Sequence, residues 1–318
     1  MNNLKKIGLT ALAGSLVATS VAYSGELAVS GSAGMNFKNY SDSSTGKAVR
    51  MGNSVFFKGS GETDGGLNVN LSFELDQGTP AGDGPFDSHF VSVGNDTLGT
   101  LTVHGHGGSN AAAALDTTAA GDLWDNTLIN TTATASTRMA PLASKSGDNL
   151  MVYSLPTLVD GLAVAGSYQA TNTTGSGSTA FGATYSGIEG LSLSYGQGSS
   201  EGTLNVEGDQ TIMKASYAYG PITVGASNND YDHTTASNDQ EVSSVSLSYT
   251  VSDQISVSYG EETIDRSGSA SDIEVTGVSI SYTSGGMTAS FAQVEAENVD
   301  HTASLNKEVW KIGLSFAF

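Results

Sequence analysis

The chain has 318 residues, with 32 acidic and 12 basic side chains and a formal net charge of −20. This acidic excess argues against nucleic acid as a partner, because phosphate binding requires a basic face. The absence of cysteine excludes disulfide scaffolds, Cys-ligated zinc, iron–sulfur clusters and cysteine nucleophiles. Only 14% of the residues are charged, and the 40 glycines disfavour helices throughout the chain.

The first 22 residues have the pattern of a secretory signal peptide. Lys5 and Lys6 form a positive start, an apolar stretch covers Ile7–Ala18, and Ser20-Val21-Ala22 fits a cleavage site. A transmembrane helix is the alternative, but the stretch is shorter than the roughly 20 residues of a span. We predict an exported protein whose mature domain covers residues 23–318.

Short segments with strict alternation follow along the chain. In Leu67–Leu75 every odd position is apolar and every even position is polar, which is the period of a β-strand. The same period recurs in residues 191–195, 245–249, 255–259, 278–282 and 310–318. The sequence therefore predicts an all-β protein.

Short and long connections alternate between these segments. Turn residues form short connections at 62–66, 95–99, 156–161, 186–190, 219–221, 251–254 and 284–286. Longer polar stretches lie at 38–50, 76–87, 107–147, 171–178, 199–208, 229–240, 264–271 and 298–306. This rhythm predicts about sixteen strands in a transmembrane antiparallel β-barrel, with short turns at one end and long loops at the other.

Closure of the barrel follows from the solvent. A bilayer offers no water to unpaired backbone groups, so a spanning sheet has no free edge, and period two places apolar side chains on lipid and polar ones in the lumen. A soluble sandwich also alternates, but the signal peptide and the loop rhythm favour a barrel. Tyrosines near strand ends fit an aromatic belt, with ordinary strand tyrosines as the alternative: Tyr168, Tyr185, Tyr195, Tyr217, Tyr249, Tyr259 and Tyr282.

Three segments resemble the general porins of Gram-negative outer membranes, of the alphaproteobacterial type. They are LGTLTVHGH (98–106), NLMVYSLPTLVDGLAVAGSYQA (149–170) and the terminal KIGLSFAF that ends at Phe318. The resemblance implies a homotrimer in the outer membrane, in contact with its lipid, that lets small hydrophilic solutes diffuse passively. It also implies that the barrel-assembly machinery reads Phe318, and that the third loop folds into the lumen.

The third long connection, residues 107–147, is the candidate constriction. Loops beyond about 12–15 residues are usually functional or disordered. This one carries Asp116, Asp122 and Asp125. The resemblance implies that basic side chains face these carboxylates across the pore, and the candidates are Arg50, Lys58 and Arg138. A solvated surface loop is the alternative, although Trp124 and Ala111–Ala114 favour packing.

Other candidate sites are weaker. His104 and His106 lie two residues apart on one strand, a spacing that suits a metal site or a polar lumen lining. Acidic groups at 230–232, 239–241 and 295–297 could collect Ca²⁺, with a solvated acidic rim as the alternative. We otherwise expect no cofactor.

The predicted function is a water-filled diffusion channel with a weak preference for cations. By strand parity, the lumen-facing Lys58, Lys214 and Lys311 are offset by Glu74 and Glu262. A substrate-specific channel is the main alternative, and an outer-membrane barrel enzyme or an adhesin is a lesser one. We do not expect an enzyme, because no Ser/His/Asp arrangement has a family-specific context. An adhesin solenoid would need a fixed repeat.

Overall fold

The computed structural model describes residues 25–41, 46–76, 86–124, 147–170, 177–201 and 207–318. The predicted signal peptide and parts of several loops lie outside these ranges. The strands are β1 Glu26–Tyr40, β2 Lys47–Glu62, β3 Asn68–Asp76, β4 Phe86–Asn95, β5 Gly99–His106, β6 Leu150–Ser154, β7 Leu162–Ala170, β8 Gly177–Tyr185, β9 Leu191–Glu201, β10 Gly208–Tyr219, β11 Ile222–His233, β12 Gln240–Ser252, β13 Ile255–Arg266, β14 Ile273–Ser284, β15 Met287–Glu297 and β16 Lys307–Ala317. Three short 3₁₀ helices complete the described elements: η1 Ala113–Leu115, η2 Ala236–Asn238 and η3 Val299–His301.

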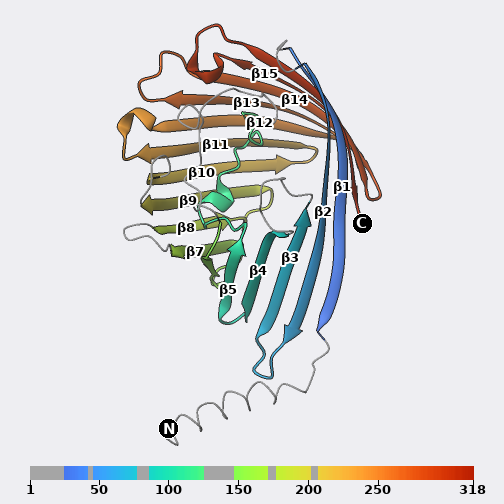
Figure 1. Cartoon of the computed structure of the whole chain (residues 1–318), viewed down its shortest axis with the longest axis vertical. Helices are drawn as coiled ribbons and strands as arrows, with labels where there is room; N and C mark the ends of the chain where they lie inside the picture. Colours follow the sequence, from blue (N-terminus) through green and yellow to red (C-terminus); the bar gives the residue numbers. More distant parts are fainter. Residues whose placement is uncertain (1–24, 42–45, 77–85, 125–146, 171–176, 202–206) are drawn as a thin grey trace, which may run out of the picture.

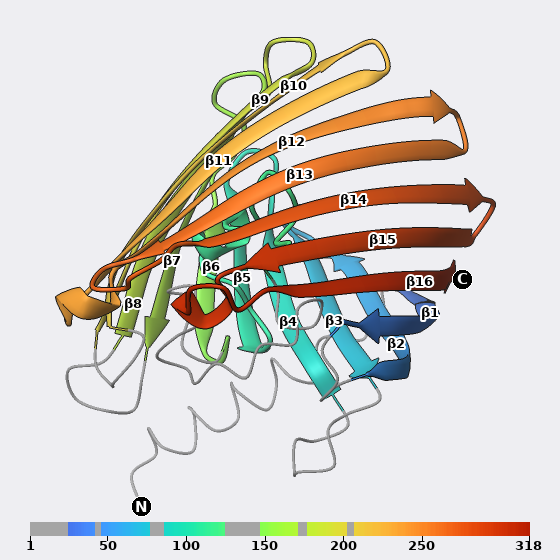
Figure 2. The same ribbon diagram turned by 90° about the horizontal axis from the view of Figure 1, so that it is seen from above.

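The sixteen strands form one closed antiparallel barrel in which every strand pairs with its neighbours in the chain (Figures 1 and 2). The first and last strands close the ring, with Ser32 opposite Ala317 and Tyr40 opposite Val309. At the chain end, Gly31 and Phe318 exchange two backbone hydrogen bonds of 2.7 and 3.0 Å. The predicted fold is confirmed. Among the described residues, no helix is long and apolar enough to span a membrane.

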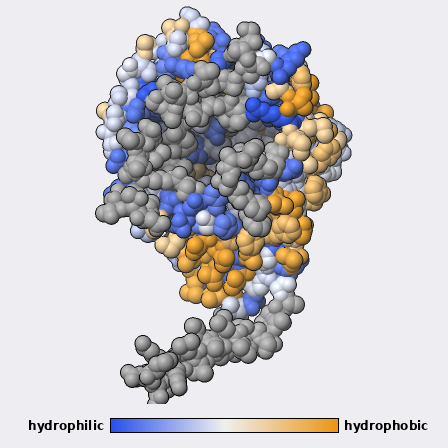
Figure 3. Space-filling view, in the orientation of Figure 1, coloured by the Kyte–Doolittle hydropathy of each residue, from blue (hydrophilic) through white to orange (hydrophobic). Residues whose placement is uncertain are grey.

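The outer face of the barrel carries the large apolar side chains. Ile312, Phe291, Ile280, Val257 and Tyr249 lie opposite one another in turn on β16, β15, β14, β13 and β12, so they form one row around the wall. Most of this row is exposed, as a lipid-facing surface must be in an isolated chain. In Figure 3, hydrophobic residues gather in the lower part of the molecule, where the lower ends of β2–β5 lie in Figure 1. Hydrophilic residues surround the central hollow.

Near the long-loop ends of β11–β16 the apolar side chains change face. On β12, Val245 and Leu247 are exposed on the outside, whereas Val242 is fully buried on the inside. The same switch on neighbouring strands produces an internal cluster that includes Tyr40, Tyr231, Val242, Ile264, Ile273, Val275, Val294, Ala296, Val299 and Val309. The expectation that inward positions are only small or polar is therefore wrong at this end of the barrel.

Carboxylates occupy outward-facing positions at these strand ends, where the apolar side chains face inward. Asp230 lies opposite Glu241, and Glu274 lies opposite Glu297, all on strands and facing outward by parity. The sequence had placed residues 229–240 in a loop, but β11 continues to His233. These strand ends thus have a polar outside and an apolar inside, the reverse of the membrane-spanning middle.

Candidate constriction inside the barrel

The third loop enters the barrel after β5 and follows the inner wall, and Figure 1 shows its short helix η1 within the ring of strands. Its backbone N–H groups donate to serine hydroxyls on three strands, in the pairs Ala111–Ser167 on β7 (2.9 Å), Ala119–Ser227 on β11 (2.8 Å) and Ala120–Ser244 on β12 (2.9 Å). At the start of this path, the Asn110 Oδ1 atom accepts hydrogen bonds from the backbone N–H groups of Ala112 and Ala113. The loop is therefore fixed along about half of the circumference.

Five inward-facing glycines of the barrel wall leave room for the loop, and we call them the glycine track: Gly182, Gly196, Gly225, Gly260 and Gly277. A Cβ atom on Gly182 would lie 2.3 Å from the Ala111 carbonyl oxygen, and one on Gly260 would lie 2.6 Å from the Ala120 Cβ. Similar contacts occur where Gly196 and Gly225 meet the loop alanines and where Gly277 meets Leu123. Any larger residue would push the loop toward the pore axis, so the glycine track sets how far the loop narrows the lumen.

Glu262 on β13 holds the far part of the loop. Its side chain is 2% exposed and accepts a hydrogen bond from the Thr118 hydroxyl and another, of 2.9 Å, from the Trp124 N–H. Thr118 and Asp122 also bond to each other, through Thr118 N–H to Asp122 Oδ1 (2.9 Å) and Asp122 N–H to Thr118 Oγ1 (2.8 Å). Beyond them, Leu123 and Trp124 pack against the internal apolar cluster.

Lys214 and Asn229 bind the loop between its two alanine segments. The Lys214 ammonium donates to the carbonyl oxygens of Leu115 (3.1 Å) and Thr117 (2.8 Å), and Asn229 donates to the carbonyl oxygen of Asp116. The Asp116 carboxyl is partly withdrawn from water. This burial and the neighbouring Asp122 raise the pKa of Asp116 to about 6, although Lys214 acts in the opposite direction.

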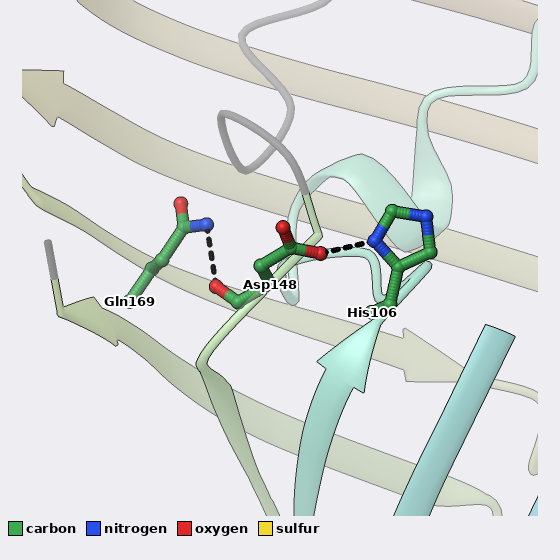
Figure 4. A network of polar contacts seen from close by, with 3 residues as sticks. All are labelled: His106, Asp148 and Gln169. Atoms are coloured by element: carbon green, nitrogen blue, oxygen red, sulfur yellow. Dashed lines mark hydrogen bonds and ion pairs between the residues drawn. The ribbon is translucent and has the colours of Figure 1, made fainter. Parts of the chain in front are cut away.

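The two ends of the loop meet at its base. Gly108 donates a 3.0 Å backbone hydrogen bond to Gly147, and the His106 ring pairs with the Asp148 carboxylate. The Asp148 carbonyl oxygen in turn accepts a 2.9 Å hydrogen bond from Gln169 on β7 (Figure 4). His104 has a different neighbour, since its ring lies 5.5 Å from that of Phe90. The two histidines thus contact different parts of the structure.

The predicted basic wall lies across the barrel. Arg50 stands on β2 between Val49 and Met51, which are 80% and 62% exposed on the outer face, so Arg50 faces the lumen. Lys58 shares this face, with its Nζ 5.3 Å from the Phe56 ring centre. Because β2 and β10 are eight strands apart in the ring of sixteen, this wall is opposite the loop segment at Asp116.

Lys311 on β16 extends that wall, since it faces inward by parity. Lys38 lies opposite it on β1 and also points inward, but its side chain is only 3% exposed, so it does not line the open lumen. Asp125 and Arg138 fall outside the described residues. Of the other predicted site residues, the structure brings together Asp116 and Asp122 on the loop and places Arg50 and Lys58 on the opposite wall. The cation beside Asp116 is Lys214, which parity had placed in the lumen without assigning it to the loop. The glycine track and the role of Glu262 were missed.

Comparisons with known proteins agree with this architecture. A family model described as "Gram-negative porin" matches residues 8–302. Among solved structures, a quintuple mutant of the Rhodopseudomonas blastica porin superposes with a TM-score of 0.67 at 15% identity, covering 92% of this chain and 100% of that chain. A triple mutant of the same porin gives a TM-score of 0.66 at 16% identity, with the same coverage. No curated protein matches.

The structural likeness is at a low identity and supports the fold, whereas the family match covers most of the chain. The proteins of that family are channels rather than enzymes. The expected resemblance and location are thereby confirmed. With a closed barrel around a polar lumen, this chain belongs to the Gram-negative porin family and forms a passive channel in the outer membrane.

Proposed function

We propose that the channel is a general diffusion pore for small hydrophilic solutes with a weak preference for cations, set by the third loop. The observation that carries this proposal is the position of Asp116 and Asp122 on a loop that is bound to the inner wall. Charges in a narrow, low-dielectric passage act on ions more strongly than the same charges on an open rim.

The preference is weak because the opposite wall is basic. Arg50, Lys58 and Lys311 face the lumen across from the loop carboxylates, so a passing ion meets both signs of charge. Salt screens each contribution over a Debye length of about 8 Å at physiological ionic strength. We therefore expect selectivity to decrease further in concentrated salt.

The test is the reversal potential of purified channels in a planar bilayer across a potassium chloride gradient. The triple variant Asp116→Asn with Asp122→Asn and Asp125→Asn should lose the cation preference, while its single-channel conductance persists. The control variant Glu295→Gln with Glu297→Gln removes carboxylates from the outer face and should leave the potential unchanged. An unchanged potential in the triple variant would assign the acidity of the protein to its surface and end the proposal.

We also propose that the protein assembles as a homotrimer in the lipid of the outer membrane. The outward positions of β1 include the small residues Gly31 and Ala33 beside Val29 and Met35, which allows close lateral approach of a second barrel. Native mass measurement in mild detergent should give the mass of three chains. A monomer as the sole species would contradict this assembly.

A further inference from the structure

The wall opposite the loop contains a recess of about 410 Å³, formed by β15, β16, β1, β2 and β3. Its floor consists of Gly34, Gly52 and Gly313. A Cβ atom on Gly52 would meet nothing within 4 Å, and one on Gly34 would come no closer than 3.6 Å to another atom. The third loop occupies the space above the glycines of the track. In contrast, no other part of the described chain covers Gly34 and Gly52.

Both signs of charge border this recess. Lys311 lies on its long-loop side, where the Cε atom is 3.8 Å from the position of a Cβ on Gly313, so the side chain extends over the floor. Asp76 lies on the short-turn side, directly opposite Ser54 on β2. Asn36 lines the long-loop side with Lys311, and Ser32 lines the other side with Asp76.

We propose that this recess is a binding subsite for zwitterionic solutes of the amino-acid type. The carboxylate of the solute lies toward Lys311 and its ammonium group toward Asp76. The volume lies within the roughly 300–1,000 Å³ of small-molecule sites. Binding in a conducting pore must be weak enough for the solute to leave, and a recess open to the lumen satisfies this requirement. The proposal rests on the diffusion function, because the solute reaches the recess through the lumen.

The experiment records single-channel current in potassium chloride while L-glutamine is added, with D-ribose as the neutral solute of similar mass. Wild-type channels should show brief, saturable current interruptions with glutamine and none with ribose. Asp76→Asn and Lys311→Gln should each shorten the interruptions by about ten-fold, the loss expected for one charge-assisted hydrogen bond. Current in potassium chloride alone tests the channel itself, so loss of the channel is distinguished from loss of the subsite.

Two size variants separate the recess from the rest of the lumen. Gly52→Leu places a side chain on the floor, where its Cβ would meet nothing within 4 Å, and should abolish the interruptions. Ser248→Leu places the same side chain at a lumen-facing position on β12, outside the recess, and should preserve them. Interruptions that are equal for glutamine and ribose would overturn the proposal, as would equal loss in both leucine variants. Sensitivity to Lys311→Gln alone would also overturn it, because the recess would then select anions.

Discussion

Asp116 ionises in a setting unlike that of an exposed carboxylate. Burial and Asp122 raise its pKa to about 6, so its negative charge is present above that pH and is lost as the pH falls through it. The reversal potential should therefore show a decreasing cation preference between pH 7 and pH 5. In Asp116→Asn this pH dependence should disappear. In Asp122→Asn the midpoint of the pH dependence should move to lower pH, because a negative charge beside Asp116 is gone. A reversal potential that still changes with a midpoint near pH 6 in Asp116→Asn would contradict the assignment.

Glu262 and Glu261 form a natural pair of test positions, since they are adjacent on β13 and face opposite sides of the wall. Glu262 holds Thr118 and Trp124, and a hydrogen bond to a charged group contributes about 1.5–3 kcal/mol. Glu262→Ala should release the loop and increase open-channel current noise, with partial recovery in Glu262→Gln, which retains an acceptor. Glu261→Ala changes only the outer face and should leave the noise at the wild-type level. Equal noise in both alanine variants would show that the loop does not depend on Glu262.

Parity alone predicted that Glu262 and Lys214 face the lumen, but not what they bind there. The partner of Glu262 is Thr118, 144 residues away in the chain. Such a contact depends on how the whole barrel curves, and no local spacing in the sequence reports it. Asp116 and Asp122 were found because they lie in an unusually long loop, which is a local signal.

At the scale of the element, the sequence of β12 itself indicates that its apolar side chains change face. Val245, Leu247 and Tyr249 occupy odd positions, whereas Val242 occupies an even one and follows Glu241. A strand that spans only lipid keeps one parity, so the switch indicates that β12 continues beyond the membrane. The predicted loop 229–240 ends where β12 begins, but it includes the end of β11, so the sequence interpretation made β11 too short.

The glycine track makes a second prediction at this scale. Gly260→Val would place its side chain against Ala120, whose Cβ is only 2.6 Å from the new Cβ position. Overpacking of this kind costs about 1–3 kcal/mol, and the loop is the part that can move. We expect a lower unfolding temperature and an altered single-channel conductance. Gly166→Val, at an outward position whose Cβ would meet only the Ala180 carbonyl oxygen at 3.9 Å, should change neither, and a wild-type conductance in Gly260→Val would refute the track.

At the scale of the whole molecule, the strand number was predictable because short turns and long loops alternate strictly along the chain. Each strand pairs with its sequence neighbours, so no long-range information was needed except for the closure of β1 on β16. The path of the loop inside the barrel was only implied by the resemblance. Its physical cause, the glycine track, becomes visible once the strands are in register.

Phe318 contributes to closure of the barrel. It is 74% exposed, and its backbone exchanges two hydrogen bonds with Gly31 on β1. Deleting Phe318 should lower the amount of protein in the outer membrane while the conductance of each assembled channel stays the same. Phe318→Leu keeps the closing hydrogen bonds but removes the aromatic ring. It therefore separates closure from the recognition by the barrel-assembly machinery that the resemblance implies for this residue. Wild-type abundance after the deletion would count against both roles.

The central claim is that the third loop lies along the inner wall and narrows the pore, and a cross-link tests it most directly. The Ala120 N–H is 2.9 Å from the Ser244 hydroxyl, and the chain has no cysteine of its own. In the double variant Ala120→Cys with Ser244→Cys, the measurement is single-channel conductance before and after oxidation. We predict that a disulfide forms and that the conductance stays at the reduced value, because the loop is already against the wall. Failure of the disulfide to form, or a large change in conductance when it does, would contradict the account.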